Sequence, residues 1–439
     1  DKNVGTGKTV TITPSYSGAD VSNYSITNHA DVTANITAKS LTVSGITASS
    51  KTYDSNVTAT MDSSSVVYNG LVSGDTFTGS YSGVFANANV GTGKTVTITS
   101  SYTGADVSNY SVTDQSSTTA DISTKILTAT ASTVNKTYDG GTTALTTLTF
   151  TGLIGSETLG QTVGSTFDNK NVGSNKTVTV NSITLADGTN GGLAANYAIS
   201  AGQTTTAHIS PKSLTVSGNT ASNKTYDSNS SATVSVTLSG FIGSETLTYT
   251  NSSSFNNKNV GTGKTVTVDS IALADGNNGG LASNYSVTPG QTTTANITAK
   301  ALTVSGISAS SKTYDGSNSS TLDTSSLLYN GLVSGDTFNG SYTGAFSNAN
   351  VGAGKTVTIT SSYSGADVSN YSITNQTSTT ADITAKALTV TASVSNKTYD
   401  ATNSATATLT LSGLIGSETL STINTSTFNN KNVGTGKTV

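Results

Sequence analysis

Residues 89–102 read NVGTGKTVTITSSY, and the pattern NVGxxKTV begins six times along the chain. From Lys94 to Tyr102 polar and apolar residues alternate with a period of two, which is typical of a β-strand with one buried face. This stretch therefore predicts a strand and also sets the period of the chain. Its copies begin at Asn3, Asn89, Asn171, Asn259, Asn350 and Asn432.

The GTGKT core resembles the phosphate-binding loop GxxxxGK[ST], in which glycines let backbone N–H groups surround a phosphate ahead of a helix. That loop needs a glycine five residues before the second glycine of GTGK, and every GxGK copy has Lys or Ala there. The copy at 173–177 reads GSNKT, and VTI or VTV follows the first five copies, which indicates a strand. We interpret the segment as a turn feeding a central strand.

Three further motifs recur with the same period, namely KTYD, an Asn-Tyr pair and GLVSGDT or GLIGSET. KTYD returns at intervals of 85 or 88 residues, and one Lys stands at each join between repeats. Type A repeats carry GLVSGDT and a later GADVSNY, whereas type B repeats carry GSET and LADG. The predicted divisions are a C-terminal part of a repeat (1–38), repeat I (39–124, type A), repeat II (125–211, type B), repeat III (212–299, type B), repeat IV (300–385, type A) and an N-terminal part of a type B repeat (386–439). Since both ends cut through a repeat, we expect a longer array.

Each repeat contains six to eight short β-branched runs bounded by Gly, Asn or Asp, and none shows helical periodicity. Asn-Gly pairs supply turns that need positive φ. The sequence therefore predicts an all-β chain, a tandem array of Ig-like β-sandwich repeats of about 87 residues that forms an elongated rod.

Composition excludes several classes of function. The net charge is −4, Arg is absent and Lys residues are scattered singly, so no basic face for nucleic acid is expected. No apolar run approaches the roughly 18 residues of a membrane-spanning helix. The chain has no Cys, which leaves the compartment open.

The ordered motifs KTYDG, GLVSGDT, NVGTGKTV, SGADVSNYSIT and ADITAKALTV resemble the YDG repeats of large secreted bacterial adhesins, which are related to filamentous-haemagglutinin-like exoproteins and mostly-bacterial Ig-like repeats. The resemblance implies an Ig-like repeat of an extracellular or cell-surface protein. YDG itself is intact only at 138–140 and 314–316, while Ser55, Ser228 or Ala401 replaces the glycine elsewhere. We therefore expect no requirement for positive φ at this position.

Two aromatic positions recur once per repeat and are interpreted as structural. The KTYD tyrosine is expected in the core or at a sandwich corner with a bonded hydroxyl, although stacking on sugars is the alternative. A Phe four residues before each complete NVG motif is expected to anchor the core. These positions are Tyr53, Tyr138, Tyr226, Tyr314, Tyr399, Phe85, Phe167, Phe255, Phe346 and Phe428.

No catalytic or cofactor-binding set is expected. The loops ADGTNGG at Asp187 and ADGNNGG at Asp275 resemble fragments of calcium loops, but each supplies one carboxylate where Ca²⁺ needs several oxygens. We expect ordinary glycine-rich loops, with Ca²⁺ as the alternative ligand. His29 and His208 have no recurring partner, and a shared position holding Asp75, Asp336, Glu157, Glu245 or Glu418 suits a turn or an ion pair.

The sequence thus predicts a non-catalytic repetitive shaft of a secreted bacterial adhesin, an extracellular fibre or a biofilm-matrix protein. Its expected partners are neighbouring repeats, with lateral self-association into fibres as a further possibility. The alternative is a module that binds glycans, of a host or a cell surface, or another surface directly through Thr- and Ser-rich strand faces. An enzyme is the third and weakest hypothesis.

Overall fold

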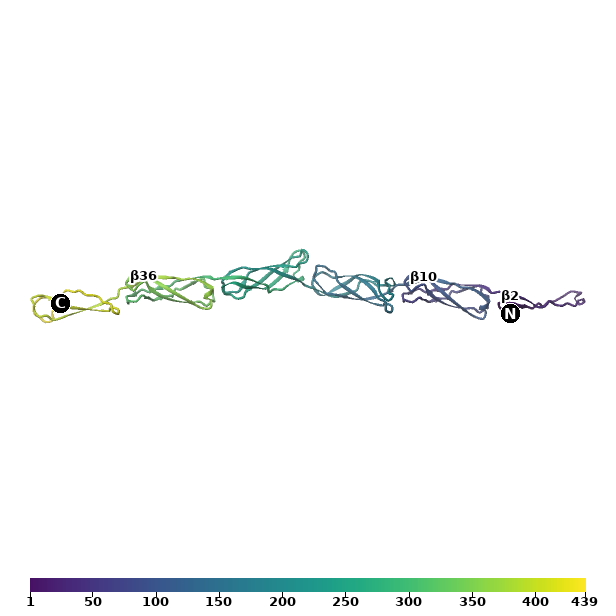
Figure 1. Cartoon of the computed structure of the whole chain (residues 1–439), viewed down its shortest axis with the longest axis horizontal. Coiled ribbons are helices and arrows are strands. Elements are labelled where there is room, and N and C mark those ends of the chain that lie inside the picture. Colours follow the sequence, from purple (N-terminus) through teal and green to yellow (C-terminus); the bar gives the residue numbers. More distant parts are fainter. The chain divides into compact units, whose positions relative to one another are not determined.

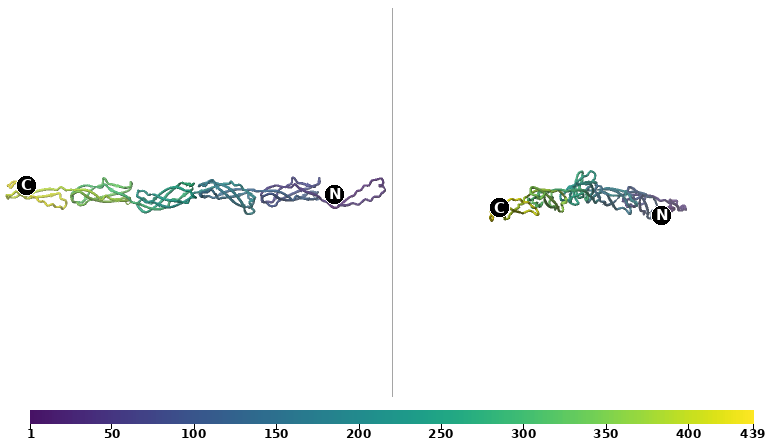
Figure 2. Two further views of the ribbon diagram at one scale, coloured as in Figure 1. Left: turned by 90° about the horizontal axis from the view of Figure 1, so that it is seen from above. Right: turned by 60° about the vertical axis from the view of Figure 1, so that its left-hand side comes forward.

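The computed structural model describes residues 1–439, and its regular structure consists of β-strands and five short 3-10 helices. The contacts divide the chain into two units, residues 1–212 with 283–285 and residues 213–282 with 286–439. Figures 1 and 2 draw every repeat as its own bundle, with the strands running along its length. The predicted all-β fold class is confirmed.

Repeat I, in the first unit, contains ten strands and one 3-10 helix. They are β3 (Lys39–Ser44), β4 (Thr47–Ala48), β5 (Lys51–Thr52), β6 (Thr58–Ala59), β7 (Met61–Asp62), β8 (Val67–Asn69), β9 (Thr78–Phe85), β10 (Gly91–Thr103), η2 (Val107–Asn109), β11 (Tyr110–Thr113) and β12 (Ser117–Ser123). A five-stranded sheet has the order β5-β12-β10-β9-β6, and a three-stranded sheet has the order β11-β3-β8. The long strand β10 is central and runs antiparallel to both of its neighbours.

The sheets of repeat I are mixed, because β3 pairs parallel with β11 and β5 pairs parallel with β12. Because successive side chains of a strand point to opposite faces of the sheet, every second side chain points toward the core. Leu41 and Val43 of the three-stranded sheet pack with Ile98 of the five-stranded sheet, and all three are buried. The predicted sandwich is therefore present, with parallel pairs in addition to the antiparallel pairing of an immunoglobulin domain.

The remaining elements of the first unit belong to repeat II and to the segment 1–38. Repeat II has β13 (Lys125–Ile126), β14 (Thr128–Thr133), β15 (Lys136–Thr137), β16 (Thr146–Thr151), β17 (Leu159–Phe167), β18 (Gly173–Asp187), η3 (Ala194–Asn196), β19 (Tyr197–Ala198) and β20 (Thr204–Ser210). The segment 1–38 has β1 (Gly5–Val10), η1 (Val21–Asn23) and β2 (Val32–Ile36).

Repeats III and IV, which lie in the second unit except for Lys212 and residues 283–285, show the same patterns. Repeat III has β21 (Lys212–Ala221), β22 (Lys224–Thr225), β23 (Ser231–Ala232), β24 (Val234–Ser239), β25 (Leu247–Phe255), β26 (Gly261–Asp275), η4 (Ala282–Asn284), β27 (Tyr285–Val287) and β28 (Thr292–Thr298). Repeat IV has β29 (Lys300–Ser305), β30 (Ser308–Ala309), β31 (Lys312–Thr313), β32 (Ser319–Ser320), β33 (Leu322–Asp323), β34 (Leu328–Asn330), β35 (Asn339–Phe346), β36 (Gly352–Ser364), η5 (Val368–Asn370), β37 (Tyr371–Thr374) and β38 (Ser378–Thr384). The last segment has β39 (Thr389–Val394), β40 (Ser404–Ala405), β41 (Ala407–Ser412) and β42 (Ser426–Thr427).

The GTGKT segment forms a β-bulge inside the central strand, which corrects the prediction of a turn ahead of that strand. Gly91 pairs with Ile122 and Lys94 pairs with Ala120, so β10 carries one extra residue. Gly93 adopts φ +59°, and its N–H donates to Asp121 Oδ1 at 2.7 Å. In the GSNKT copy Asn175 adopts φ +51°, which Asn tolerates better than most residues.

The expectation that the YDG glycine position needs no positive φ was wrong. Ser55, Ser228 and Ala401 adopt φ of 60°, 68° and 64°, in the same region as the glycines Gly140 and Gly316. The reason is an Asx turn: the Asp before each of these residues accepts the N–H of the residue after it, as Asp54 does from Asn56 at 2.9 Å. The turn therefore imposes left-handed backbone even on Ser and Ala.

Candidate functional site: the junction between repeats

The junction between repeats I and II is built from the recurring motifs. Tyr53 follows the short strand β5, where its N–H donates to Ser123 O at 2.9 Å, and its ring is 4% exposed. Its hydroxyl donates to Glu157 Oε1 at 2.8 Å, and Glu157 belongs to the GSET motif of repeat II. The KTYD tyrosine therefore serves two purposes, since it is buried in its own repeat and bonded to the next.

The second tyrosine of this junction comes from repeat II. Tyr197, which follows η3, donates to Glu157 Oε2 at 2.6 Å and accepts the Ile154 N–H at 3.0 Å. The rings of Tyr53 and Tyr197 meet edge to face, with centroids 5.4 Å apart. Burial, followed by the hydrogen bond to Glu157, raises the pKa of Tyr53 to about 12. The neutral hydroxyl therefore remains a donor over a wide pH range.

An asparagine makes the other polar contact across this junction. Asn196 is 1% exposed, and its Oδ1 accepts the Val90 N–H at 3.0 Å while its Nδ2 donates to Asn89 Oδ1 at 3.1 Å. The Asn-Tyr pair of one repeat thus binds the NVG motif of the repeat before it. The same two bonds join Asn370 to Val260 and Asn259 in the second unit, and Asn109 to Val4 and Asn3 in the first.

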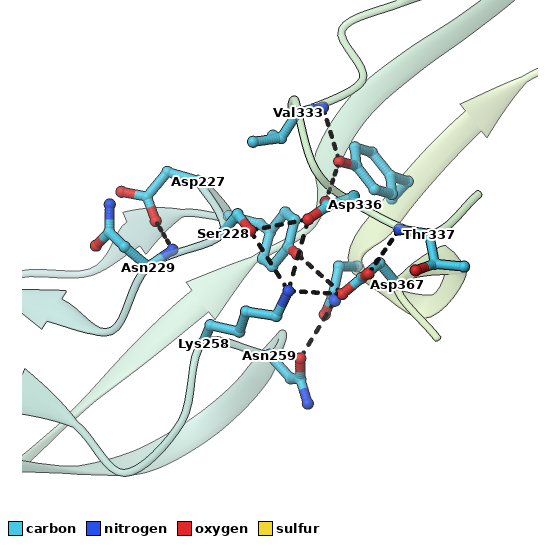
Figure 3. A network of polar contacts seen from close by, with 12 residues as sticks. Asp227, Ser228, Asn229, Lys258, Asn259, Val333, Asp336, Thr337 and Asp367 are labelled. Atoms are coloured by element: carbon cyan, nitrogen blue, oxygen red, sulfur yellow. Dashed lines mark hydrogen bonds and ion pairs between the residues drawn. The ribbon is translucent and has the colours of Figure 1, made fainter. Parts of the chain in front are cut away.

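In the second unit, the junction between repeats III and IV contains two carboxylates and a lysine (Figure 3). Lys258 Nζ lies 2.8 Å from Asp367 Oδ1 and 3.5 Å from Asp336 Oδ1. Tyr226 donates to Asp367 at 3.3 Å, and Tyr371 donates to Asp336 at 2.5 Å. The rings of these tyrosines meet edge to face with centroids 5.5 Å apart. The junction of type B with type A thus keeps the tyrosine pair and adds an ion pair.

Hydrogen bonds and the nearby lysine stabilise the anionic forms of Asp336 and Asp367. Burial alone would raise the pKa of Asp336, whose side chain is fully buried, but hydrogen bonds from Tyr371 and Ser228 outweigh burial and lower it. The hydrogen bond from Lys258, followed by that from the Thr337 N–H, lowers the pKa of Asp367. In turn the Asp367 carboxylate raises the pKa of Lys258. All three groups therefore carry charge at neutral pH.

The lysine of KTYD organises the turn from which the junction tyrosine emerges. Lys51 Nζ donates to Asp54 Oδ1 at 2.8 Å and to the carbonyl of Asn56 at 2.6 Å, and it lies 5.5 Å from the centroid of the Phe85 ring. Lys136, Lys224, Lys312 and Lys397 lie in the same way over Phe167, Phe255, Phe346 and Phe428. The hydrogen bonds from Lys312 and from the Ser317 N–H lower the pKa of Asp315 to about 2.

The predicted aromatic residues are placed as follows. Tyr53, Tyr138 and Tyr226 are buried, Tyr314 is half-buried, and Tyr399 is 57% exposed. The hydroxyl of Tyr314 donates to Glu418 in the last segment. Phe85, Phe167, Phe255 and Phe346 are buried and Phe428 is half-buried. What sequence reasoning missed is that the tyrosine, Asn-Tyr, NVG and GSET or SGDT motifs meet across the junctions.

The calcium candidates serve as local turn residues. Asp187 Oδ1 accepts the Ala194 N–H at 2.8 Å, and Asp275 Oδ1 accepts the Ala282 N–H at 2.7 Å. No group of three or more His, Asp or Glu side chains in residues 1–439 is arranged to hold a metal ion. His208 Nδ1 accepts the Asn175 N–H at 3.1 Å, so this histidine supports the bulge of β18.

The fold and the junctions define a tandem β-repeat protein whose motifs join one repeat to the next. A model of the YDG domain matches residues 37–120, 123–207, 210–295, 298–381 and 384–439. The chain belongs to the YDG domain family, as its motifs predicted.

Other comparisons add little. No curated protein matches the chain. Among solved structures, N-cadherin EC1-4 of Drosophila is 7% identical with a TM-score of 0.20, covering 88% of this chain and 97% of that one. Domains 4-9 of the surface layer protein SbsC are 14% identical with a TM-score of 0.15, covering 85% of this chain and 71% of that one. No helix of the structure has the length and apolar character needed to cross a membrane.

Proposed function

We propose that the chain is a non-catalytic spacer, the repetitive shaft of a secreted bacterial cell-surface adhesin, extracellular fibre or biofilm-matrix protein. The observation that carries this proposal is the use of the recurring motifs at the junctions. Tyr53, Asn89, Glu157 and Asn196 all meet at one junction. A chain whose recurring residues hold neighbouring repeats together is suited to transmit position and force along its length.

The connections between repeats support a stiff arrangement. One residue separates β12 from β13, and one residue separates β28 from β29. Around the first of these joins the apolar core is continuous, because Tyr53, Phe85 and Ile122 of repeat I pack in one cluster with Leu127 and Tyr197 of repeat II. Stability in such an array is the sum of repeat and interface terms, and each interface here combines apolar contacts with buried hydrogen bonds.

The non-catalytic part of the proposal rests on how the polar groups are used. The carboxylates of Glu157 and Asp336 are occupied by tyrosine hydroxyls at 2.6–2.8 Å and at 2.5 Å, respectively. Each recurs in a structural position, whereas a catalytic site needs groups poised to exchange protons with a substrate. The structural role of Glu157 and Asp336 therefore accounts for their recurrence, and no catalytic role is needed to explain it.

Localisation provides the direct test. An antibody raised against the 439-residue chain should label intact, non-permeabilised source cells or their secreted matrix. Labelling that requires permeabilisation would overturn the proposed location.

Exposed pairs of hydroxyls, such as Ser80 with Ser101, 2.8 Å apart, and Ser252 with Ser270, 2.6 Å apart, favour the alternative of direct glycan binding. Specific binding of the purified chain to an array of glycans would support that alternative.

A further inference from the structure

The residue immediately before each NVG motif is Lys or Ala, and Ala occurs only where type B sequence follows. Lys2 precedes repeat I and Lys258 precedes repeat IV, and both of these following repeats are type A. Ala88 precedes repeat II and Ala349 precedes the last segment, and both of these are type B. The structure explains why this position depends on the following neighbour.

A type A repeat presents two carboxylates to the repeat before it. In the first unit Lys2 Nζ lies 3.2 Å from both Asp75 and Asp106. In the second unit Lys258 Nζ lies 2.8 Å from Asp367 and 3.5 Å from Asp336. In both junctions, therefore, one lysine lies between two aspartates that occupy equivalent positions of the type A repeat. The lysine offsets one of two negative charges that share a buried site.

The type B repeat II presents a single carboxylate, and the residue before it, Ala88, is uncharged. Glu157 accepts both tyrosine hydroxyls, and Leu193 stands before η3 where type A has Asp367 before η5. Ala88 packs against the apolar cluster of this junction. The two kinds of junction therefore have the same formal charge of −1. At the junction of repeats I and II this charge comes from one carboxylate, and at the junction of repeats III and IV it comes from two carboxylates and one lysine.

The residue is not determined by its own repeat type. Lys2 stands in the segment 1–38, which ends with the type A sequence SGADVSNYSIT, yet it is Lys where the type A repeats I and IV have Ala88 and Ala349. Lys170 precedes repeat III, a type B repeat with one carboxylate, Glu245, where type A repeats have two aspartates. Lys therefore occurs before repeats of either type. The sequence contains no Ala before a repeat with two aspartates.

We propose that this position is a selector of the next repeat: lysine allows a type A repeat to follow, whereas alanine allows only a type B repeat. An alanine before two aspartates would leave both buried carboxylates without a cation, which is strongly unfavourable. The interaction surface is the end of a repeat bearing KTYD and NVG, and its partner is a second YDG repeat of matching charge. This inference rests on the proposed spacer function and extends it, because it restricts which repeat can follow an alanine at this position.

The test measures junction geometry in the whole chain. Because the chain has no Cys, spin labels can be attached at Thr250→Cys and Thr360→Cys, two exposed sites in repeats III and IV. We expect a narrow distribution of label distances, which Lys258→Ala broadens. We also expect Lys258→Ala to speed hydrogen exchange of the Val260 N–H, which bonds to Asn370, about tenfold, equivalent to about 1.4 kcal/mol.

Matched variants distinguish the effect of charge at the junction from nonspecific destabilisation of the repeats. Asp367→Asn removes one negative charge and keeps an oxygen for the Thr337 N–H, so Lys258→Ala combined with Asp367→Asn should restore much of the slow exchange that Lys258→Ala loses. In repeat I, Ala88→Lys should leave exchange of the Val90 N–H unchanged, since the sequence also pairs Lys with a single Glu. Unchanged exchange and distances in Lys258→Ala, or no restoration by Asp367→Asn, would overturn the selector. Either outcome would leave the spacer proposal intact, because localisation tests that proposal separately.

Discussion

The hydroxyl of Tyr53 lies 2.8 Å from Glu157 Oε1, although the two residues are 104 positions apart and belong to neighbouring repeats. Tyr197 donates to the other oxygen of the same carboxylate at 2.6 Å. One glutamate thus accepts a hydroxyl from each of two repeats. Hydrogen bonds to charged groups are worth about 1.5–3 kcal/mol each, so this small cluster is a principal polar contact of the junction.

Removal of the Tyr53 hydroxyl should loosen this junction while keeping its ring in place. In Tyr53→Phe, Glu157 retains only the bond from Tyr197, and we expect the coupling of the repeats to fall by about 1–2 kcal/mol. Hydrogen exchange of the Val90 N–H, which bonds to Asn196 across the same junction, should accelerate about five- to thirtyfold. The matched control is Tyr399→Phe, because Tyr399 is 57% exposed. Equal effects of the two variants would contradict the role of Tyr53.

Asn196 offers a graded test of the second contact. Asn196→Ala removes both bonds and leaves the half-buried Val90 N–H without an acceptor, at a cost of about 1–3 kcal/mol. Asn196→Asp keeps an oxygen for Val90 but loses the donor to Asn89 and buries a second carboxylate at a junction that already holds Glu157, so it should accelerate Val90 exchange more than Asn196→Ala does. Measurement of Val90 exchange in both variants ranks them. A smaller effect for Asn196→Asp than for Asn196→Ala would contradict this account of charge at the junction.

Alkaline pH should weaken the junction of repeats I and II over a defined range. The pKa of Tyr53 is raised to about 12, mainly by burial and then by the bond to Glu157, whereas an unfolded tyrosine has a pKa of about 10. A raised pKa stabilises the folded state fully below pH 10, and this contribution is lost as the pH rises toward 12. The difference in tyrosinate absorbance between wild type and Tyr53→Phe isolates this group. A midpoint near 10 would disprove the prediction.

The left-handed turn after KTYD predicts that a Ser→Gly substitution stabilises repeat I at Ser55 and destabilises it at Ser65. Ser55 has φ +60°, a conformation that costs a residue with a side chain about 1–2 kcal/mol, so Ser55→Gly should stabilise repeat I by up to about 1 kcal/mol. Ser65 is exposed and has no positive φ, so Ser65→Gly should destabilise the same repeat slightly. Hydrogen exchange of the Val96 amide on β10 would compare the two variants. Stabilisation by both, or by neither, would be inconsistent with a left-handed turn at Ser55.

Much of the fold could be predicted because it depends on local pattern. The period-two alternation of residues 94–102 placed Val96 and Ile98 on a buried face, and both are buried. The spacing of Phe85 from the NVG motif was enough to expect a core position. Backbone details were harder to predict, because the carboxylate of Asp54 imposes positive φ on Ser55 against the preference of serine.

The junctions could not be derived from spacing, and the reason is physical. In a periodic chain, Asp75 of repeat I and Glu157 of repeat II occupy the same position, so sequence distance cannot tell which of them Tyr53 meets. Asp75 instead accepts the hydroxyl of Tyr110 in its own repeat at 2.6 Å. Only the folded arrangement places Tyr53 at one end of its repeat and Asp75 at the other. The charge pattern at Lys258 and Ala88 was visible in the sequence, but it had no meaning until the junction was known.

The central claim is that these junctions hold neighbouring repeats in one orientation and so make the chain a spacer. Electron microscopy of single rotary-shadowed molecules of the 439-residue chain tests this most directly. We predict unbranched rods with one bead per repeat and few bends, and more bends in a variant that combines Tyr53→Phe, Asn196→Ala and Lys258→Ala. Compact particles, or beads that bend freely at every junction of the wild-type chain, would contradict the account.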